Sequence, residues 1–188
     1  GIDPFDQPDV ESAKEATRGL LDSQPKPQPA AFEEMGVEVR TMDARLTTGG
    51  TLDSAIDALL AVLPDNGYLS IQCYLDRVAH RDAVQLRDTL AARIDRPVTF
   101  GWGRRFLDST GQFHKGGPAV GVFLQVTADE RNDVSIPDRP FSFGELIHAQ
   151  AQGDASVLAE HGRPVLTLTL TDPANGLATV LAIAGQHG

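Results

Sequence analysis

The chain has 188 residues, of which 41% are hydrophobic, and a formal net charge of −10 at pH 7. These values suit one domain, or one domain with an appendage, and allow a sizeable apolar core. The acidic balance argues against nucleic acid and anionic membrane surfaces as partners, because both attract clustered Lys and Arg. The sequence contains no apolar run as long as a membrane span and no basic-then-apolar leader at its start. We therefore expect a cytoplasmic protein.

Metal and cofactor motifs are missing from the sequence. The single Cys73 rules out an internal disulfide and a cysteine-based zinc site, and its apolar surroundings predict a buried, inert thiol. The five histidines show no metal-binding spacing. A P-loop, a dinucleotide fingerprint and a Gly-x-Ser-x-Gly nucleophile turn are also absent. We expect neither a metal nor a cofactor.

The first segment predicts a helix followed by a proline-rich linker. The chain opens without Met, as the interior of a longer protein would. Pro8 suits the first position of a helix that continues to Leu21. Alternating prolines then make residues 24–35 an extended linker. We expect a helical arm over residues 1–23, separate from an α/β domain over residues 36–188.

Strands and helices alternate in the rest of the chain. Apolar runs predict strands over residues 37–41, 68–75, 98–100, 120–127 and 165–170. Helical spacing predicts helices that begin after Thr51, Asp76 and Asp172, and a fourth that begins at Phe143 and is interrupted at Gly153. This alternation implies a three-layer α/β fold, with a mostly parallel sheet covered by helices on both faces.

Residues 106–118 read Phe-Leu-Asp-Ser-Thr-Gly-Gln-Phe-His-Lys-Gly-Gly-Pro and lie between two apolar runs. We predict a polar, glycine-rich loop here, where α/β proteins usually place function. Its candidate ligand-binding side chains are Ser109, Thr110, Gln112, His114 and Lys115.

The residues of this stretch leave alternatives open. His114 is either catalytic or structural. Lys115 with its two glycines is either a phosphate cradle or a turn between strands. Asp108 with Asp129 or Glu130 could form a carboxylate pair, although a solvated rim explains these residues better.

Two separated segments resemble glucose-6-phosphate isomerases. Residues 2–14, Ile-Asp-Pro-Phe-Asp-Gln-Pro-Asp-Val-Glu-Ser-Ala-Lys, resemble the C-terminal signature of that family, which leads into a helix carrying an active-site lysine. Residues 106–127 resemble the final region of the isomerase part of bifunctional transaldolase/glucose-6-phosphate isomerase proteins. Residues 137–144, 149–154 and 162–166 fit the same region.

The resemblance implies a sugar isomerase-like α/β fold and an aldose–ketose isomerase. In that reaction a proton moves from the C1 hydroxyl of glucose 6-phosphate to the ring oxygen, and a carboxylate base then moves a proton between C2 and C1 through an enediol. Lys14 carries over as the active-site lysine. His114 carries over as a second catalytic candidate, although the family has histidine directly after Gly-Gln and Phe113 intervenes here. Ser109, Thr110, Gln112 and Lys115 would contact sugar or phosphate.

The sequence lacks two parts of the family pattern. The Glu-Ser-x-Gly-Lys segment with the catalytic glutamate and the Ser/Thr-rich phosphate loop are both absent and would lie upstream of Gly1. One hypothesis is a C-terminal fragment, inactive alone, that completes a sugar phosphate site together with upstream domains. The other is that the body after residue 35 is a non-catalytic module for assembly or ligand sensing. A shared cleft for Lys14 and residues 106–118 would favour catalysis. The oligomeric state, a homo-oligomer included, stays open.

Overall fold

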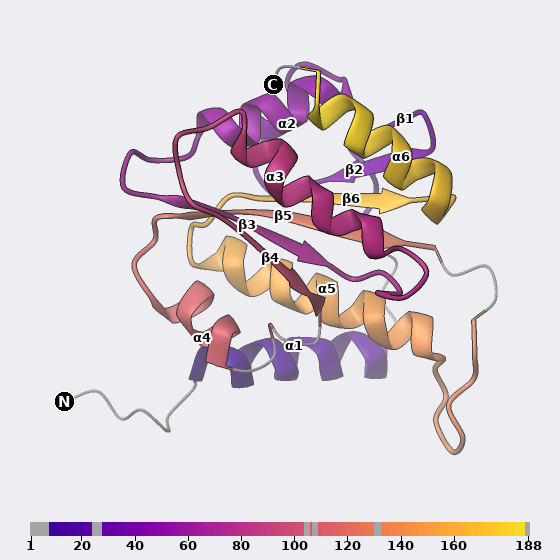
Figure 1. Ribbon diagram of the computed structural model, residues 1–188. Coiled ribbons are helices and arrows are strands. Elements are labelled where there is room, and N and C mark those ends of the chain that lie inside the picture. Colours follow the sequence, from indigo (N-terminus) through magenta and orange to yellow (C-terminus); the bar gives the residue numbers. More distant parts are fainter. Residues whose placement is uncertain (1–7, 24–27, 104–105, 107–108, 130–132, 187–188) are drawn as a thin grey trace.

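In the computed structural model, the described residues are 8–23, 28–103, 106, 109–129 and 133–186. They form a six-stranded sheet between two sets of helices (Figure 1). The strands are β1 Phe32–Glu34, β2 Val37–Arg40, β3 Tyr68–Cys73, β4 Val98–Trp102, β5 Gly121–Ala128 and β6 Val165–Leu170. The α-helices are α1 Pro8–Ser23, α2 Leu52–Ala61, α3 Gln85–Ala91, α4 Ser109–Gly116, α5 Phe143–Glu160 and α6 Pro173–Ala184, and 3-10 turns span Ala44–Thr47 and Arg81–Val84.

The sheet has the strand order β1-β2-β6-β5-β3-β4. Strands β3, β4, β5 and β6 are parallel, whereas β1 and β2 are antiparallel at one edge. Helices α2, α3 and α6 cover one face, and α4 and α5 cover the other (Figure 1). The predicted three-layer, mostly parallel α/β fold is therefore confirmed.

Local signals in the sequence explain where several helices begin. The Thr51 and Ser54 side chains form a reciprocal capping box at the start of α2. Ser142 and Glu145 do the same for α5. The Asp172 carboxylate caps α6, and proline fills the first position of that helix.

Two predicted boundaries are wrong. Phe32–Glu34, placed in the linker by the sequence, forms edge strand β1, because Met35 and Gly36 both take positive φ angles and close a tight hairpin onto β2. The helix expected directly after Asp76 begins only at Gln85, since the Asp76 carboxylate caps a local turn instead.

The two faces of the sheet differ in chemistry. Residues of β2, β3, β5 and β6 that face α2, α3 and α6 are almost all Val, Leu or Ile, and they form the main core. Cys73 lies in this core as predicted, and burial raises the pKa of its thiol to about 12. The opposite face carries Ser70 and Gln72 on β3 and Gln125 and Thr127 on β5.

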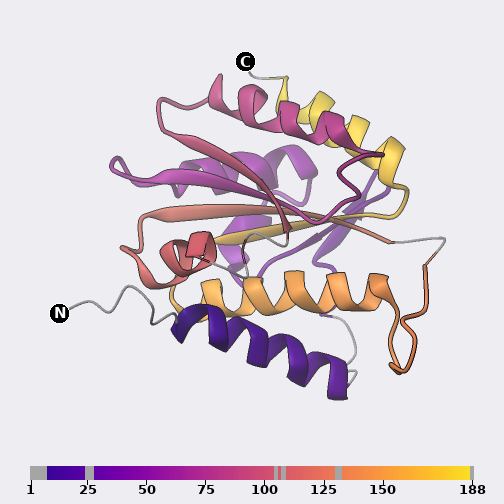
Figure 2. The ribbon, with the colours of Figure 1, turned by 60° about the horizontal axis from the view of Figure 1, so that its bottom comes forward.

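Helix α1 lies against the outer side of α5 and α4 (Figure 2). The sequence predicts an arm separate from the rest, but the buried side chains of Val10, Ala13 and Thr17 pack this helix onto the domain. Of the two expectations for this segment, a tail or a docking arm, the packing favours a docking arm. The proposed division at the linker stays a prediction, because residues 24–27 lie outside the described residues.

Gly153 allows this docking. A Cβ at Gly153 would lie 2.7 Å from Thr17 Oγ1 and 3.0 Å from the Ala13 carbonyl oxygen. The predicted interruption of α5 at Gly153 is wrong, since the helix runs unbroken to Glu160. The glycine serves close helix packing instead.

We expect Gly153→Ala to loosen α1. Replacing glycine by alanine in a helix stabilises the helix by about 1 kcal/mol. Here the added methyl group would also push the α1 backbone away from α5, which destabilises the packing by about 1–3 kcal/mol. Tryptic cleavage after Lys14 or Arg18 should therefore accelerate roughly tenfold. Gly19→Ala is the matched control, because a Cβ there meets no atom within 4 Å. Unchanged cleavage of Gly153→Ala would contradict the close approach.

Candidate functional site

The stretch predicted as a loop folds largely as helix α4, Ser109–Gly116. This correction has a topological reason: the connection from β4 to the parallel strand β5 crosses the sheet, and such crossovers are usually helical. Gly111 is required because a Cβ there would lie 1.8 Å from the Phe106 carbonyl oxygen. The glycine in this sequence therefore marks close packing and not a flexible loop.

Helix α4 separates the predicted ligand-binding side chains. His114 and Lys115 are buried, whereas Thr110 is exposed. Gln112 is half-buried, and its side-chain oxygen accepts a hydrogen bond from the Val10 amide at 3.4 Å. The Ser109 side chain lies outside the described residues. These residues are not gathered in one cleft.

The imidazole of His114 is part of the core. It is 4% exposed, and its Nδ1 lies 2.8 Å from the Tyr68 hydroxyl and its Nε2 lies 3.4 Å from the Ser70 hydroxyl. Burial, together with the nearby positive charges of Lys115 and Arg163, lowers the pKa of His114 to about 4. The ring is therefore neutral at pH 7, with both nitrogens engaged.

Lys115 is fully buried beneath α4. Its ammonium forms an ion pair with the carboxylate of Asp154 on α5 and donates to the Phe106 carbonyl at 3.0 Å. The Tyr74 hydroxyl donates to the other oxygen of Asp154. Burial also raises the pKa of Tyr74 well above its usual value, so this phenol stays a donor. The structure thus places Lys115 where it joins α4, α5 and the end of β3; the contact with sugar or phosphate that the resemblance implies stays a prediction.

Lys14 lies on the solvent side of α1. Its side chain is 37% exposed, and its ammonium pairs with Glu11 at 2.7 Å. This hydrogen bond lowers the pKa of Glu11. Lys14 and His114 lie in different environments, one at the surface and one under α4, and neither lines the pocket described next.

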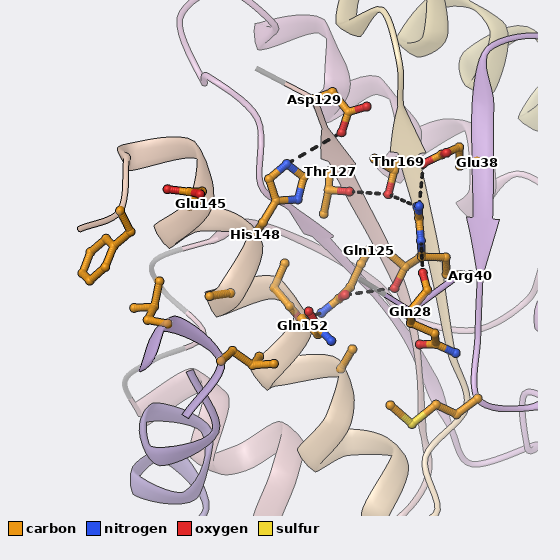
Figure 3. Close-up of a pocket in the computed structure, with 18 residues that line it drawn as sticks. Gln28, Glu38, Arg40, Gln125, Thr127, Asp129, Glu145, His148, Gln152 and Thr169 are labelled. Carbon is orange, nitrogen blue, oxygen red and sulfur yellow. Dashed lines mark hydrogen bonds and ion pairs between the residues drawn. The ribbon is translucent and has the colours of Figure 1, made fainter. Parts of the chain in front are cut away.

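A pocket of about 620 Å³ lies between α5, the end of α1 and the polar face of the sheet (Figure 3). Its floor is formed by side chains of β2, β5 and β6, namely Glu38, Arg40, Gln125, Thr127, Thr167 and Thr169. Its helical wall is formed by Glu145, His148, Ala149, Ala151, Gln152 and Ala155 of α5. The small alanines of α5 leave room above the strands.

A hydrogen-bond network runs across the floor at Gln125. The Gln125 amide nitrogen donates to Gln72 at 3.0 Å and to the Ala151 carbonyl at 3.2 Å. The Thr167 hydroxyl donates to the Gln125 side-chain oxygen at 3.1 Å. Because buried polar groups are costly unless bonded, these contacts fix the orientation of the amide.

A second set of bonds orders the other side of the floor. The Thr127 hydroxyl donates to Thr169 at 2.9 Å. Arg40 donates to the same Thr169 hydroxyl at 2.9 Å, to Glu38 at 2.6 Å and to the Gln28 carbonyl at 2.8 Å. Figure 3 shows these bonds running from Thr127 through Thr169 to Arg40, across three neighbouring strands. The floor is a preorganised polar surface.

Sequence reasoning missed this pocket, although a signal was present. Inner strands of parallel sheets usually read as continuous apolar runs, because helices cover both faces. Here Gln125, Thr127, Thr167 and Thr169 recur at every second position of β5 and β6. The alternation in β6 predicts a strand, and its polar positions are the signal for a site.

The described residues contain no group of three His, Cys, Asp or Glu side chains arranged to hold a metal ion. In the pocket, His148 Nε2 lies 3.9 Å from Asp129 Oδ1. Among the same residues, no helix is long and apolar enough to cross a membrane.

The fold and pocket define a three-layer α/β protein with one apolar sheet face and an opposite face that is polar at the pocket. Neither a family model nor a curated protein matches the chain. A solved structure, that of the hypothetical protein TT0462 from Thermus thermophilus, is similar with a TM-score of 0.59 and 19% sequence identity. The match covers 76% of this chain and 40% of the other, so the chain spans well under half of that protein. At this identity the similarity concerns the fold alone.

Proposed function

We propose that this chain is the C-terminal part of a glucose-6-phosphate isomerase and that its catalytic contribution is Lys14. The observation that carries the proposal is the position of this lysine. It belongs to the segment that resembles the isomerase signature, and it lies at the solvent side of α1 with its ammonium paired to Glu11. Residues 1–7 of the signature lie outside the described residues.

In this proposal Lys14 serves the ring-opening step. The step needs a proton donor at the ring oxygen while the C1 hydroxyl loses its proton. An ammonium on a partly exposed helix face can reach a substrate held by a neighbouring domain. The glutamate that moves the proton between C2 and C1 would come from residues upstream of Gly1, so the isolated chain should not convert fructose 6-phosphate.

A second candidate function concerns the body after residue 35, as a non-catalytic module for assembly or ligand sensing. The burial of His114 and Lys115 favours it. The imidazole is buried with both nitrogens bonded, and the ammonium is buried against Asp154. We therefore assign His114 a structural role in the module, and we propose sugar phosphate as the substrate of the Lys14 site only.

The test is the activity of the intact parent protein with fructose 6-phosphate. We expect Lys14→Ala to reduce kcat by on the order of 10²-fold, because a general acid is lost, while His114→Gln keeps kcat within about twofold. Glu11→Gln is the matched control, since it removes the partner of Lys14 but leaves the ammonium in place.

The outcomes separate the two candidates. Equal losses in Lys14→Ala and His114→Gln, with folding intact by circular dichroism, would place both residues in catalysis and remove the module interpretation. Unchanged kcat in Lys14→Ala would contradict the isomerase proposal. Turnover by the 188-residue chain alone would show that the chain needs no upstream glutamate.

A further inference from the structure

The pocket between α5 and the polar sheet face has the size of a ligand site. Its volume of about 620 Å³ falls within the range of roughly 300–1,000 Å³ typical of small-molecule pockets. It lies over the carboxyl-terminal halves of β5 and β6, and it extends to Asp129, which directly follows β5. Open α/β sheets commonly bind ligands beyond the carboxyl ends of their strands.

We infer that this pocket binds an uncharged polyhydroxylated molecule of the size of a monosaccharide or disaccharide. The hydroxyls of such a ligand both donate and accept hydrogen bonds. The floor offers the hydroxyls of Thr127, Thr167 and Thr169, and the buried Gln125 amide supports them from below. Their mutual bonds hold them in place before a ligand arrives, which lowers the ordering cost of binding.

Gln152 supplies the wall opposite this floor. It projects from α5 into the lining, it is half-buried, and no other described residue forms a hydrogen bond with its side-chain amide. A planar amide with one acceptor and two donor hydrogens matches two adjacent hydroxyls of a polyol. Gln152 is therefore the amide that a ligand would engage.

The pocket also offers apolar contact. Phe141 lines it on the approach to α5, and Ala149, Ala151 and Ala155 line it along the helix. A sugar ring has C–H faces that pack against aromatic and small apolar surfaces. Polar and apolar walls together fit a ring with hydroxyls at its edge.

The charge of the lining selects against phosphate. Three carboxylates, Glu38, Asp129 and Glu145, line the pocket against one permanent cation, Arg40. The Arg40 guanidinium is already engaged by Glu38, Thr169 and the Gln28 carbonyl. A phosphate dianion would meet net negative charge, so the ligand is unphosphorylated and differs from the substrate proposed for Lys14.

The experiment is calorimetric titration of the 188-residue protein with D-glucose, D-fructose, maltose and myo-inositol, with glucose 6-phosphate for comparison. We expect saturable binding of at least one uncharged compound, at least roughly tenfold tighter than glucose 6-phosphate. Gln152→Leu should weaken that binding roughly tenfold, since it removes the unbonded amide. Gln150→Leu is the matched control on the same helix, because Gln150 does not line the pocket.

Three results would overturn the inference: no saturable binding of any uncharged compound at tens of millimolar, tighter binding of glucose 6-phosphate, or equal affinities of the two leucine variants. If Gln152→Leu fails to fold, the isosteric Thr167→Val tests the floor instead. The Lys14→Ala variant should retain full binding, so failure of the isomerase proposal and failure of this inference are separate outcomes.

Discussion

Asp154→Asn is expected to destabilise the protein by about 3–5 kcal/mol, the cost of leaving a buried charge without its partner. Lys115 and Asp154 are both fully buried, and the Tyr74 hydroxyl supplies a further bond to the carboxylate. Asparagine keeps the size of the side chain and an acceptor for Tyr74, but it leaves the Lys115 ammonium without a counter-charge. Urea unfolding followed by circular dichroism measures the loss.

Two control variants test whether the loss of stability comes from leaving one buried charge unpaired. The double variant Lys115→Met/Asp154→Leu removes both charges and should recover most of the stability, because apolar replacements of buried pairs are often neutral or stabilising. Glu11→Gln breaks the exposed Lys14–Glu11 pair and should have no measurable effect. A small loss in Asp154→Asn, no larger than that in Glu11→Gln, would show that Lys115 reaches solvent.

Much of the fold could be predicted because its signals are local. Thr51 and Asp172 cap helices at the positions that the sequence indicates, and the apolar runs of β3, β5 and β6 mark central strands. Proline-rich composition also placed the end of the first helix close to its observed end at Ser23. Periodicity and caps depend on neighbouring residues, which a sequence displays directly.

The surroundings of the predicted site residues could not be predicted, because they depend on tertiary contacts. The sequence does not indicate which of Lys14 and Lys115 is exposed and which is buried. In the structure, the partner of Lys115 is Asp154, 39 residues away, whereas the partner of Lys14 is three residues away. Glycine gave a similar error, because Gly111 and Gly153 suggest flexibility but allow close backbone packing. The pocket floor comes from three strands that only the sheet order brings together.

The stability of the protein is expected to fall by roughly 3 kcal/mol as the pH drops from about 6.5 to about 4, through His114 alone. The pKa of His114 is lowered from 6.5 to about 4 in the folded state, mainly by burial. Within this window the unfolded chain binds a proton that the folded protein does not. Acid therefore favours the unfolded state, and the effect is complete once the pH is below the folded pKa.

The variant His114→Gln isolates this contribution, because carboxylates also titrate in the same window. Glutamine can accept from Tyr68 and donate to Ser70 as the neutral imidazole does, but it binds no proton. The free energy of unfolding of the variant, measured with urea at pH 4.5 and pH 7, should differ less between the two pH values than that of the wild type. His80→Gln, at a half-buried histidine outside this cluster, should keep the wild-type difference. An equal pH dependence in His114→Gln and wild type would mean that the imidazole is protonated as easily in the folded protein as in the unfolded chain. The ring would then be open to solvent, and its place in a catalytic cleft would have to be reconsidered.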